Sequence, residues 1–471
     1  MAVGRPLFRV SRACAAALGL VAALAGSTLA RAAGAPCSAT VVCVSADGTR
    51  SLGPASLVAQ GFIHGVDPTT NPGLVAALRP RAWLYDDNEA AYASAASNGA
   101  SITYLLSDAW EKATAGPQGP QVPWQNWATY SRFIANQVRQ VLAAGQTVSY
   151  WSIQSEPDGL IGAQRGTPAQ MLREYAIGVA AVRSVDPHAR FVGPNLAAYN
   201  DNPASPTIDL VRFLDFAVAN RLPVDAVAWH EVGNRVSAAY RGGPADLIDH
   251  VNAARRLLAA RPSLGRPVIV INEYQSNATH LIPGWSVAWI AALEAAGVTQ
   301  ANRACWHEPD ITGRPIAECS EGSVDGLFIP ESGLPQAVYF VHRAYADMAG
   351  NKAPTSTTNA AVTAFSTYDP GSSTLRVLLG RHQSCTPDVR VDCPDPASTV
   401  PPPVDVALRL TVPNAPSLVS VDVERVPNST GAMAGPVPVS SSTVAVGGGP
   451  LTLRLPGVVD GDAYVVTVRP L

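Results

Sequence analysis

Val268-Ile269-Val270-Ile271-Asn272-Glu273-Tyr274 contains a short apolar run that predicts a buried strand, and the run ends in a carboxylate. A second stretch, Ser149-Tyr150-Trp151-Ser152-Ile153-Gln154-Ser155-Glu156-Pro157, has the same form and also ends in a glutamate. Each stretch predicts a strand with one acidic side chain at its carboxyl end.

Six more short apolar runs accompany these two, and longer amphipathic stretches separate them. The eight predicted strands are Leu57–Ile63, Ala82–Tyr85, Ser101–Leu106, Thr147–Ile153, Phe191–Gly193, Ala226–His230, Pro267–Asn272 and Ala301–Trp306. This alternation is typical of β/α units with a parallel sheet. Eight units favour a closed (β/α)8 TIM barrel of the α/β class over residues 57–352. No GxGxxG follows the first strand, so an open dinucleotide-binding sheet lacks its main support.

Three of the intervening helices have recognisable ends. One is predicted from about Trp124 to Ala144, with an apolar stripe formed by Phe133, Ile134, Val138, Val141 and Leu142. Another begins with Thr167 as N-cap and Pro168 at its first position. The last helix of the ring is predicted over Gly333 to Met348.

After residue 352 the helical periodicity stops, and short alternating segments follow. They are Thr374–Leu379, Val404–Leu410, Leu418–Val426, Leu451–Leu455 and Ala463–Val468. Residues 353–471 are therefore predicted to form an all-β, sandwich-like C-terminal domain. Residues 34–56 are expected to add a strand to it, which would join the chain start to the chain end.

Size and charge agree with this division. The chain has 471 residues, which suits a barrel of roughly 250 to 300 residues with a smaller companion. Hydrophobic residues make up 47% and charged residues 15%, which predicts a compact globular protein. A formal net charge of -3 provides no basic surface for nucleic acid or anionic lipid.

Residues 1–33 are predicted to be a secretory signal peptide. Arg5, Arg9 and Arg12 precede the apolar run Ala13–Ala25, and small residues surround Arg31. The run is shorter than the roughly 20 residues that span a bilayer, so export with cleavage is favoured over a membrane anchor. A secreted protein, extracellular or periplasmic, is expected.

The cysteines suggest disulfides. Of seven cysteines, Cys14 would leave with the signal peptide, and an even number in an exported chain is typical of paired thiols. Many pairings are open, and the spacing favours three local ones: Cys37 with Cys43, Cys305 with Cys319, and Cys385 with Cys393. A metal site is the rival interpretation, but no CxxC pair accompanies these residues.

The two strand-end glutamates carry the functional hypothesis. A buried carboxylate is costly unless it is paired or used. Active sites of such barrels lie at the carboxyl ends of the strands, so Glu156 and Glu273 are expected to face one pocket. Retaining glycosidases need one carboxyl group as acid and one carboxylate as nucleophile, about 5 to 5.5 Å apart. A structural ion pair, or two unrelated polar caps, is the alternative.

Glu156-Pro157 and Asn272-Glu273 resemble the acid/base and nucleophile motifs of the clan A glycoside hydrolases. Within the clan the chain is most similar to family 39, which includes xylosidases and iduronidases, and family 79 also fits. The resemblance implies a retaining hydrolase that cleaves an O-glycosidic bond of an oligo- or polysaccharide. Glu156 would be the general acid/base and Glu273 the nucleophile, without metal or organic cofactor.

The chain departs from the clan pattern before the acid/base. Clan members usually place an asparagine there, whose amide contacts the sugar 2-hydroxyl, whereas this chain has Ser155 preceded by Gln154. Either residue could supply that hydrogen bond, or the substrate carries a different group at this carbon.

Other strand ends supply candidates for the pocket wall. His230 stands where the resemblance implies a partner of the nucleophile, and Trp306 where it implies the floor under the sugar; a rim histidine and a core tryptophan are the alternatives. Further candidate substrate contacts follow the other strands: His64, Asp86, Asp87, Asp108, Trp110, Asn195 and Tyr274.

Two rival functions remain open. The missing asparagine makes a non-catalytic carbohydrate-binding barrel protein conceivable. A metal-dependent barrel enzyme, such as an aldolase or amidohydrolase, would use His230, Glu231, His307 and Glu308, and Glu231 and Glu308 also compete for the catalytic roles. Neighbours on a strand point to opposite faces, which counts against this cluster.

Overall fold

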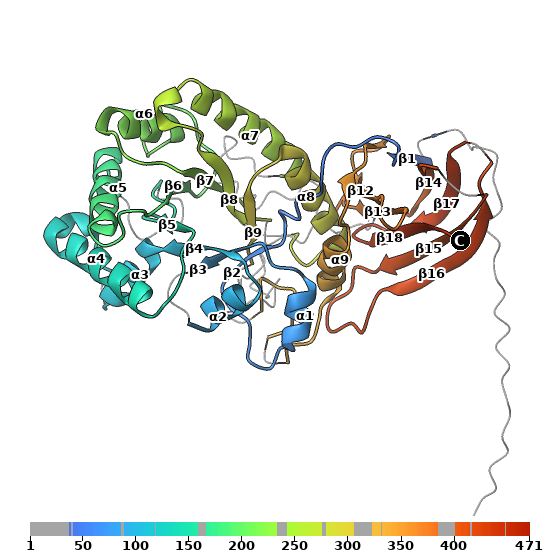
Figure 1. Ribbon diagram of the computed structural model, residues 1–471, viewed down its shortest axis with the longest axis horizontal. Helices are drawn as coiled ribbons and strands as arrows, with labels where there is room; N and C mark the ends of the chain where they lie inside the picture. Colours follow the sequence, from blue (N-terminus) through green and yellow to red (C-terminus); the bar gives the residue numbers. More distant parts are fainter. Residues whose placement is uncertain are drawn as a thin grey trace, which may run out of the picture.

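The computed structural model describes residues 37–38, 41–85, 89–117, 119–158, 166–232, 243–275, 279–305, 323–330, 332–384, 401–414, 417–447 and 449–471. Eight parallel strands close into a barrel, as Figure 1 shows on its left side, and the predicted (β/α)8 barrel is confirmed. In barrel order the strands are β2 (Gly61–Ile63), β3 (Ala82–Tyr85), β4 (Ser101–Leu105), β5 (Tyr150–Ser152), β6 (Phe191–Leu196), β7 (Ala226–Glu231), β8 (Val268–Tyr274) and β9 (Gln300–Arg303).

Helices surround the barrel. They are α1 (Pro72–Ala77), α2 (Glu89–Ser97), α3 (Leu106–Thr114), α4 (Trp127–Ala143), α5 (Pro168–Arg183), α6 (Leu210–Asn220), α7 (Pro244–Ala259), α8 (Pro283–Ala296) and α9 (Ala337–Ala346), with 3-10 turns η1 (Pro123–Gln125) and η2 (Pro262–Leu264). The predicted start of α5 is confirmed: Thr167 caps it and accepts from the Gln170 N–H, with Pro168 at the first position. On α4, Ile134, Val138 and Val141 are buried, but Leu142 is 39% exposed and was wrongly placed on the stripe.

Seven of the eight predicted barrel strands differ from the structure at one or both ends, and the first and the last are among those that differ by three residues or more. The first begins at Gly61 and not at Leu57, because Leu57 adopts a left-handed backbone with φ 54° and forms a turn in which the Gln60 N–H donates to its carbonyl. The last strand ends at Arg303, three residues before Trp306.

The last helix is shorter than predicted. α9 starts at Ala337, because Gly333 has φ 63° and Pro335 forms an isolated bridge with Phe328. The chain therefore forms a turn and a bridge where the helix was expected to begin.

A β-sandwich adjoins the barrel, so the predicted fold class is confirmed for both parts. One sheet has the order β11 (Thr355–Thr357), β1 (Val41–Asp47), β14 (Val404–Thr411), β17 (Leu451–Val458). The other has the order β10 (Asn351–Lys352), β12 (Val362–Asp369), β13 (Thr374–Arg381), β18 (Ala463–Pro470), β15 (Leu418–Val426), β16 (Val437–Ala445). Strand β1 lies between β11 and β14, so the chain start is a central part of this domain.

The sandwich packs on the barrel through α8. Figure 1 shows α8 and α9 beside β12 and β13 at the junction. The Gly284 N–H donates to the Gly461 carbonyl at 2.7 Å, and Trp285 Nε1 donates to the Ser384 carbonyl at 2.8 Å. A Cβ on Gly284 would lie 1.9 Å from the Arg381 carbonyl oxygen, so the two backbones touch without a side chain between them.

The cysteine and membrane predictions are tested in part. Cys37 and Cys43 form a disulfide, and Cys305 is also disulfide-bonded. Cys319, Cys385 and Cys393 lie outside the described residues, as does the predicted signal peptide 1–33. No helix in the described part of the chain is both long enough and apolar enough to cross a membrane.

Candidate active site

Glu156 is held in a tight turn after β5. Its backbone is left-handed, with φ 51°, and its N–H donates to the Asn195 carbonyl at 2.8 Å. Two residues further on, an oxygen of Asp158 accepts from the Ala197 N–H at 2.9 Å. Both bonds tie the turn to the end of β6.

A β-bulge in β8 aims Glu273 into the barrel mouth. Trp229 pairs with Ile271 and His230 with Glu273, so Asn272 is one extra residue in β8. Because side chains alternate along a strand, this extra residue lets both Asn272 and Glu273 lie on the inner side. Strict alternation would have turned one of them outward.

A second bulge does the same in β6. Pro194 pairs with Ala228 and Leu196 with Trp229, which leaves Asn195 as the extra residue, with φ 61°. The Asn195 side chain is thereby directed to the inside, beside Asn272.

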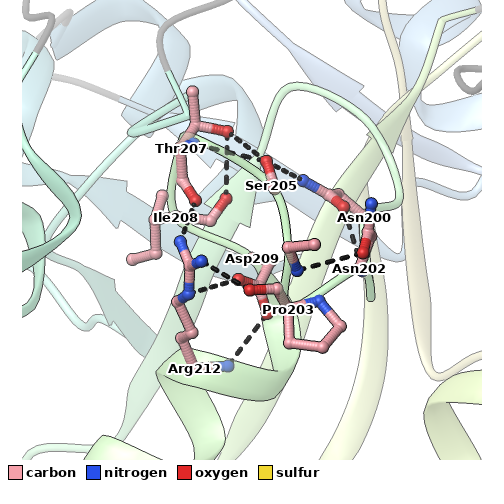
Figure 2. A network of polar contacts seen from close by, with 9 residues as sticks. Asn200, Asn202, Pro203, Ser205, Thr207, Ile208, Asp209 and Arg212 are labelled. Atoms are coloured by element: carbon pink, nitrogen blue, oxygen red, sulfur yellow. Dashed lines mark hydrogen bonds and ion pairs between the residues drawn. The ribbon is translucent and has the colours of Figure 1, made fainter.

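The loop after β6 is braced by a polar network, shown in Figure 2. Asn200 Nδ2 donates to Ser205 Oγ at 3.2 Å, and Ser205 Oγ lies 3.0 Å from Thr207 Oγ1. Asp209 caps α6 by accepting from the Arg212 N–H at 2.9 Å. The strand end that carries Asn195 is thus continuous with an ordered loop.

His230 joins the two glutamates. Its Nδ1 lies 3.0 Å from Glu156 Oε1 and 2.9 Å from Glu273 Oε2. One carboxylate oxygen of each glutamate and the imidazole nitrogen all lie within 4.8 Å of one another. His230 is fully buried, whereas the side chains of Glu156 and Glu273 are 15% and 8% exposed. The two carboxylates and the imidazole therefore form one largely buried cluster.

Burial and charge compete at His230. Burial opposes the charged ring and lowers its pKa, but the adjacent Glu273 and Glu156 outweigh burial and raise the pKa to about 10. The imidazole thus carries a positive charge between the carboxylates at neutral pH.

Asp158 is a site residue that the sequence reasoning did not name. It is 2% exposed, and its second oxygen has no hydrogen-bond partner in the structure. Burial, and to a smaller extent the charge of Glu156, raises its pKa to about 7. Its signal was its position, two residues after Glu156 on the same strand-end turn.

Three predicted substrate contacts are corrected. Gln154 turns outward, where Nε2 donates to the Met171 carbonyl at 3.0 Å and to Glu174 at 3.1 Å. Tyr274 is fully buried and its hydroxyl donates to the Ala59 carbonyl at 2.8 Å. Trp110 lies within α3 and donates from Nε1 to the Gln121 carbonyl at 2.6 Å. All three face the helical layer and not the mouth.

Asn195 is also corrected. Its exposed fraction is zero, so it cannot touch a substrate. Its Nδ2 lies 3.4 Å from the Ser155 hydroxyl, and Ser155 itself is half-buried beside Glu156. Of the two residues that precede Glu156, Ser155 is therefore the one whose side chain lies on the inner side, near Asn195.

His64 lies in a separate polar group at the mouth. Its Nδ1 is 3.1 Å from Asp325, whose other oxygen accepts from the Ile63 N–H. Burial raises the pKa of Asp325 to about 6, although His64 opposes the shift. Arg303 Nε donates to the Asp325 carbonyl at 2.9 Å, and its other nitrogens donate to Gln275 and His280. Asp325 and Arg303 were not predicted.

Two further candidate residues, Asp108 and Glu231, lie away from the three clustered side chains. Asp108 lies in the first turn of α3, half-buried, where it accepts from the Ser107 hydroxyl at 3.0 Å. Glu231 turns to the outside of β7 and accepts from Trp229 Nε1 at 2.6 Å and from His250 at 2.8 Å. The rival metal cluster is thereby split, because His230 and Glu231 face opposite sides. Outside the described residues lie Asp86, Asp87, Trp306, His307 and Glu308.

Within the described residues, Glu156, His230 and Glu273 are the group whose ligand atoms lie close enough together for a shared metal ion. The distances from His230 Nδ1 to Glu156 and to Glu273 are those of hydrogen bonds, so the three side chains also satisfy one another directly.

Several solved structures share this fold. A protein from Neocallimastix frontalis has a TM-score of 0.69 at 18% identity, over 92% of this chain and 100% of that chain. A monomeric beta-xylosidase from Caulobacter crescentus has 0.63 at 15%, over 91% and 99%. The GH39 enzyme from Xanthomonas axonopodis pv. citri has 0.63 at 15%, over 91% and 97%. No protein-family model and no curated protein matches the sequence. The likeness covers barrel and sandwich together, and it establishes the fold.

Proposed function

We propose that this protein is a secreted retaining glycoside hydrolase of clan A, similar to family 39, that cleaves an O-glycosidic bond of an oligo- or polysaccharide. The observation that carries the proposal is the closeness of the two carboxylates: one oxygen of Glu156 and one oxygen of Glu273 lie at most 4.8 Å apart. Retaining enzymes hold their carboxyl groups about 5 to 5.5 Å apart, and inverting enzymes about 6.5 to 9.5 Å apart to admit a water.

The residues have distinct roles in this proposal. Glu156 protonates the leaving oxygen while Glu273 attacks the anomeric carbon and forms a glycosyl-enzyme. The deprotonated Glu156 then activates the water that releases the sugar with its original configuration. Ser155 lies next to Glu156 and is proposed to contact the sugar, as is His64 across the mouth. The chemistry requires no metal or organic cofactor.

The structural neighbours support this substrate class. They include a beta-xylosidase, a GH39 enzyme and a glucosidase from Croceicoccus marinus. Each shares barrel and sandwich with this chain, and the site occupies the carboxyl ends of the barrel strands, where such barrels carry their chemistry.

Export is part of the proposal. Cleavage of residues 1–33 would deliver a chain whose Cys37–Cys43 disulfide suits an oxidising compartment. N-terminal sequencing of the protein recovered from the culture medium or periplasm tests it; recovery of an intact residue 1 in the cytoplasm contradicts it.

Azide rescue tests the reaction. With aryl glycosides as substrates, Glu273→Ala should lower kcat by at least about a thousandfold, and azide should restore turnover with an inverted glycosyl azide. Glu156→Ala should keep the first step with good leaving groups and give the retained azide. Glu231→Gln, a strand-end glutamate that faces outward, is the matched control and should remain active.

The outcomes separate the rival functions. Sugar binding without any turnover by the wild-type protein, on aryl glycosides and a polysaccharide panel, would favour a binding protein and reject the hydrolase. Activity that EDTA abolishes would favour a metal-dependent enzyme.

A further inference from the structure

Both nitrogens of the His230 imidazole have polar partners within hydrogen-bond distance. Nδ1 faces Glu156 and Glu273, and Nε2 lies 3.0 Å from Asn195 Oδ1. Both nitrogens of this buried ring lie against protein atoms, so these neighbours decide where its hydrogens lie.

Asn195 fixes the hydrogen on Nε2. Its Oδ1 also accepts from Asn272 Nδ2 at 2.8 Å, and its Nδ2 faces two acceptors, the Gln154 carbonyl and the Ser155 hydroxyl, each at 3.4 Å. Reversing the amide would set oxygen against oxygen. Oδ1 is an acceptor only, so His230 Nε2 must be the donor.

A second hydrogen follows on Nδ1. Two carboxylate oxygens at 3.0 and 2.9 Å would repel a bare nitrogen lone pair. The ionisable groups around the ring are Glu156 after β5, Glu273 on β8 and Asp158 just beyond Glu156, and all of them favour the charged ring. Asn195 and Asn272 add no charge.

We infer that His230 stores the proton that Glu156 delivers to the leaving group, and that Asn195 is the positioning residue that makes this storage possible. The inference rests on the proposed glycosidase function. In this inference, attack by Glu273 on the anomeric carbon causes His230 to release its proton.

The step balances in atoms and charge. The Nδ1–H bond breaks and the proton passes through Glu156 Oε1 to the leaving oxygen, as the bond from that oxygen to the anomeric carbon breaks. A bond forms between this carbon and Glu273, whose negative charge is consumed. His230 becomes neutral, Glu156 remains a carboxylate, and the net charge of the three side chains is unchanged at −1 throughout. Loss of the Glu273 charge removes the main attraction that kept the proton on the ring.

Histidine-selective 15N NMR of the full-length enzyme tests the inference without any substrate. The His230 signal, assigned by its loss in His230→Gln, should show both nitrogens protonated at neutral pH. In Glu273→Gln, which mimics the neutral ester, the His230 pKa should fall by about two pH units or more. Glu231→Gln is the matched control, because it removes the charge beside His250 on the outer face and should leave the His230 signal unchanged.

Asn195 is tested by the pH profile of kcat/KM. Asn195→Ala removes the acceptor at Nε2 and should move the basic limb of the profile down by about one pH unit, whereas Asn195→Asp keeps an acceptor and should not lower it. Asn302→Ala is the control: Asn302 is another buried amide inside the barrel, 1% exposed and without a bond to His230. A merely structural role would lower stability in both alanine variants without moving either profile.

The two proposals can fail separately. A neutral His230 in the free wild-type enzyme, or a pKa that Glu273→Gln leaves in place, overturns proton storage even if azide rescue succeeds. If His230 is charged but the protein never hydrolyses glycosides, the assigned charge of His230 holds. Its role in delivering a proton to a leaving group is then rejected together with the proposed function.

Discussion

Asp158 shows how one side chain can position another. Its bond to the Ala197 N–H holds the turn on which Glu156 adopts a left-handed backbone. A side chain in this region of φ is strained, so the turn depends on such ties. The position of the Glu156 carboxylate thus depends on a neighbouring side chain.

Asp158→Ala should therefore lower kcat by at least about tenfold, because a displacement of about 1 Å misaligns the Glu156 carboxyl group for proton transfer to the leaving oxygen. Asp158→Asn keeps an oxygen for the Ala197 N–H and should stay within a few-fold of the wild type. Steady-state kinetics of both variants on one aryl glycoside decide the matter. Equal loss in the two would show that the charge and not the bond is required.

Substitution of Tyr274 tests whether this residue is part of the core or contacts the substrate. Its hydroxyl is buried against the Ala59 carbonyl, far from solvent. Tyr274→Phe should lower the free energy of unfolding by about 1 to 2 kcal/mol, since a buried acceptor loses its donor. Urea unfolding measures this loss, and KM should not change. A raised KM with unchanged stability would restore Tyr274 as a substrate contact.

Elements explain which site residues could be read from the sequence. The runs before Glu156 and Glu273 identify their strands, and their ends identify the mouth. The inner or outer side of each residue was less accessible, because the bulges at Asn195 and Asn272 interrupt the alternation on which such assignments depend. Tyr274 follows the extra residue in β8 and was therefore taken for a mouth residue. Asp158 lies on the turn after β5, where strand alternation assigns no side, and it was overlooked.

The packing of α5 against the barrel contains a costly charge. Glu174 is 2% exposed and accepts from Gln154 Nε2 at 3.1 Å. Burial raises its pKa from 4.5 to about 7, although the Gln154 bond opposes the shift. Because the folded protein binds this proton more tightly than the unfolded chain, the protonated carboxyl group contributes its full stability below about pH 4.5. This contribution is lost as the pH rises from about 4.5 to about 7.

Glu174→Gln should therefore raise the free energy of unfolding at pH 8 by up to about 3 kcal/mol relative to the wild type, and by much less at pH 4. Urea unfolding at the two pH values measures the difference. Glu424→Gln on β15, a half-exposed carboxylate, is the control and should change stability little at either pH. A pH-independent effect of Glu174→Gln would contradict the assigned burial cost.

The order of the two parts of the molecule, a barrel followed by a sandwich, could be predicted from the sequence. After residue 352 the hydrophobic pattern changes from the helical period to the alternation typical of strands. Several short or polar strands of the sandwich were not predicted, among them β10, β11 and β16. The residues of β16, Val-Pro-Val-Ser-Ser-Ser-Thr-Val-Ala, are exposed or half-exposed. The contact between the two parts was equally hidden, since it depends on backbones far apart in sequence.

That contact makes barrel and sandwich one unit. Helix α8 is buried along nearly its whole length, which a helix of the barrel surface achieves only when a second layer covers its outer face. Gly284 permits this, because its N–H bonds to Gly461 and its Cα lies against the Arg381 backbone. A single methyl group at this point should therefore separate two domains.

Gly284→Ala places a Cβ 1.9 Å from the Arg381 carbonyl oxygen, a contact that only backbone movement can relieve. We expect a loss of about 3 kcal/mol or more in the free energy of unfolding, because overpacking at a rigid contact commonly costs 1 to 3 kcal/mol and here no side chain can yield. Calorimetry should show one transition for the wild type and a lower or split transition for the variant. Gly435→Ala is the matched control, since a Cβ there meets no atom within 4 Å and its φ is ordinary. Equal melting of the two variants would mean that the sandwich is a separable appendage and that the barrel does not need it to cover α8.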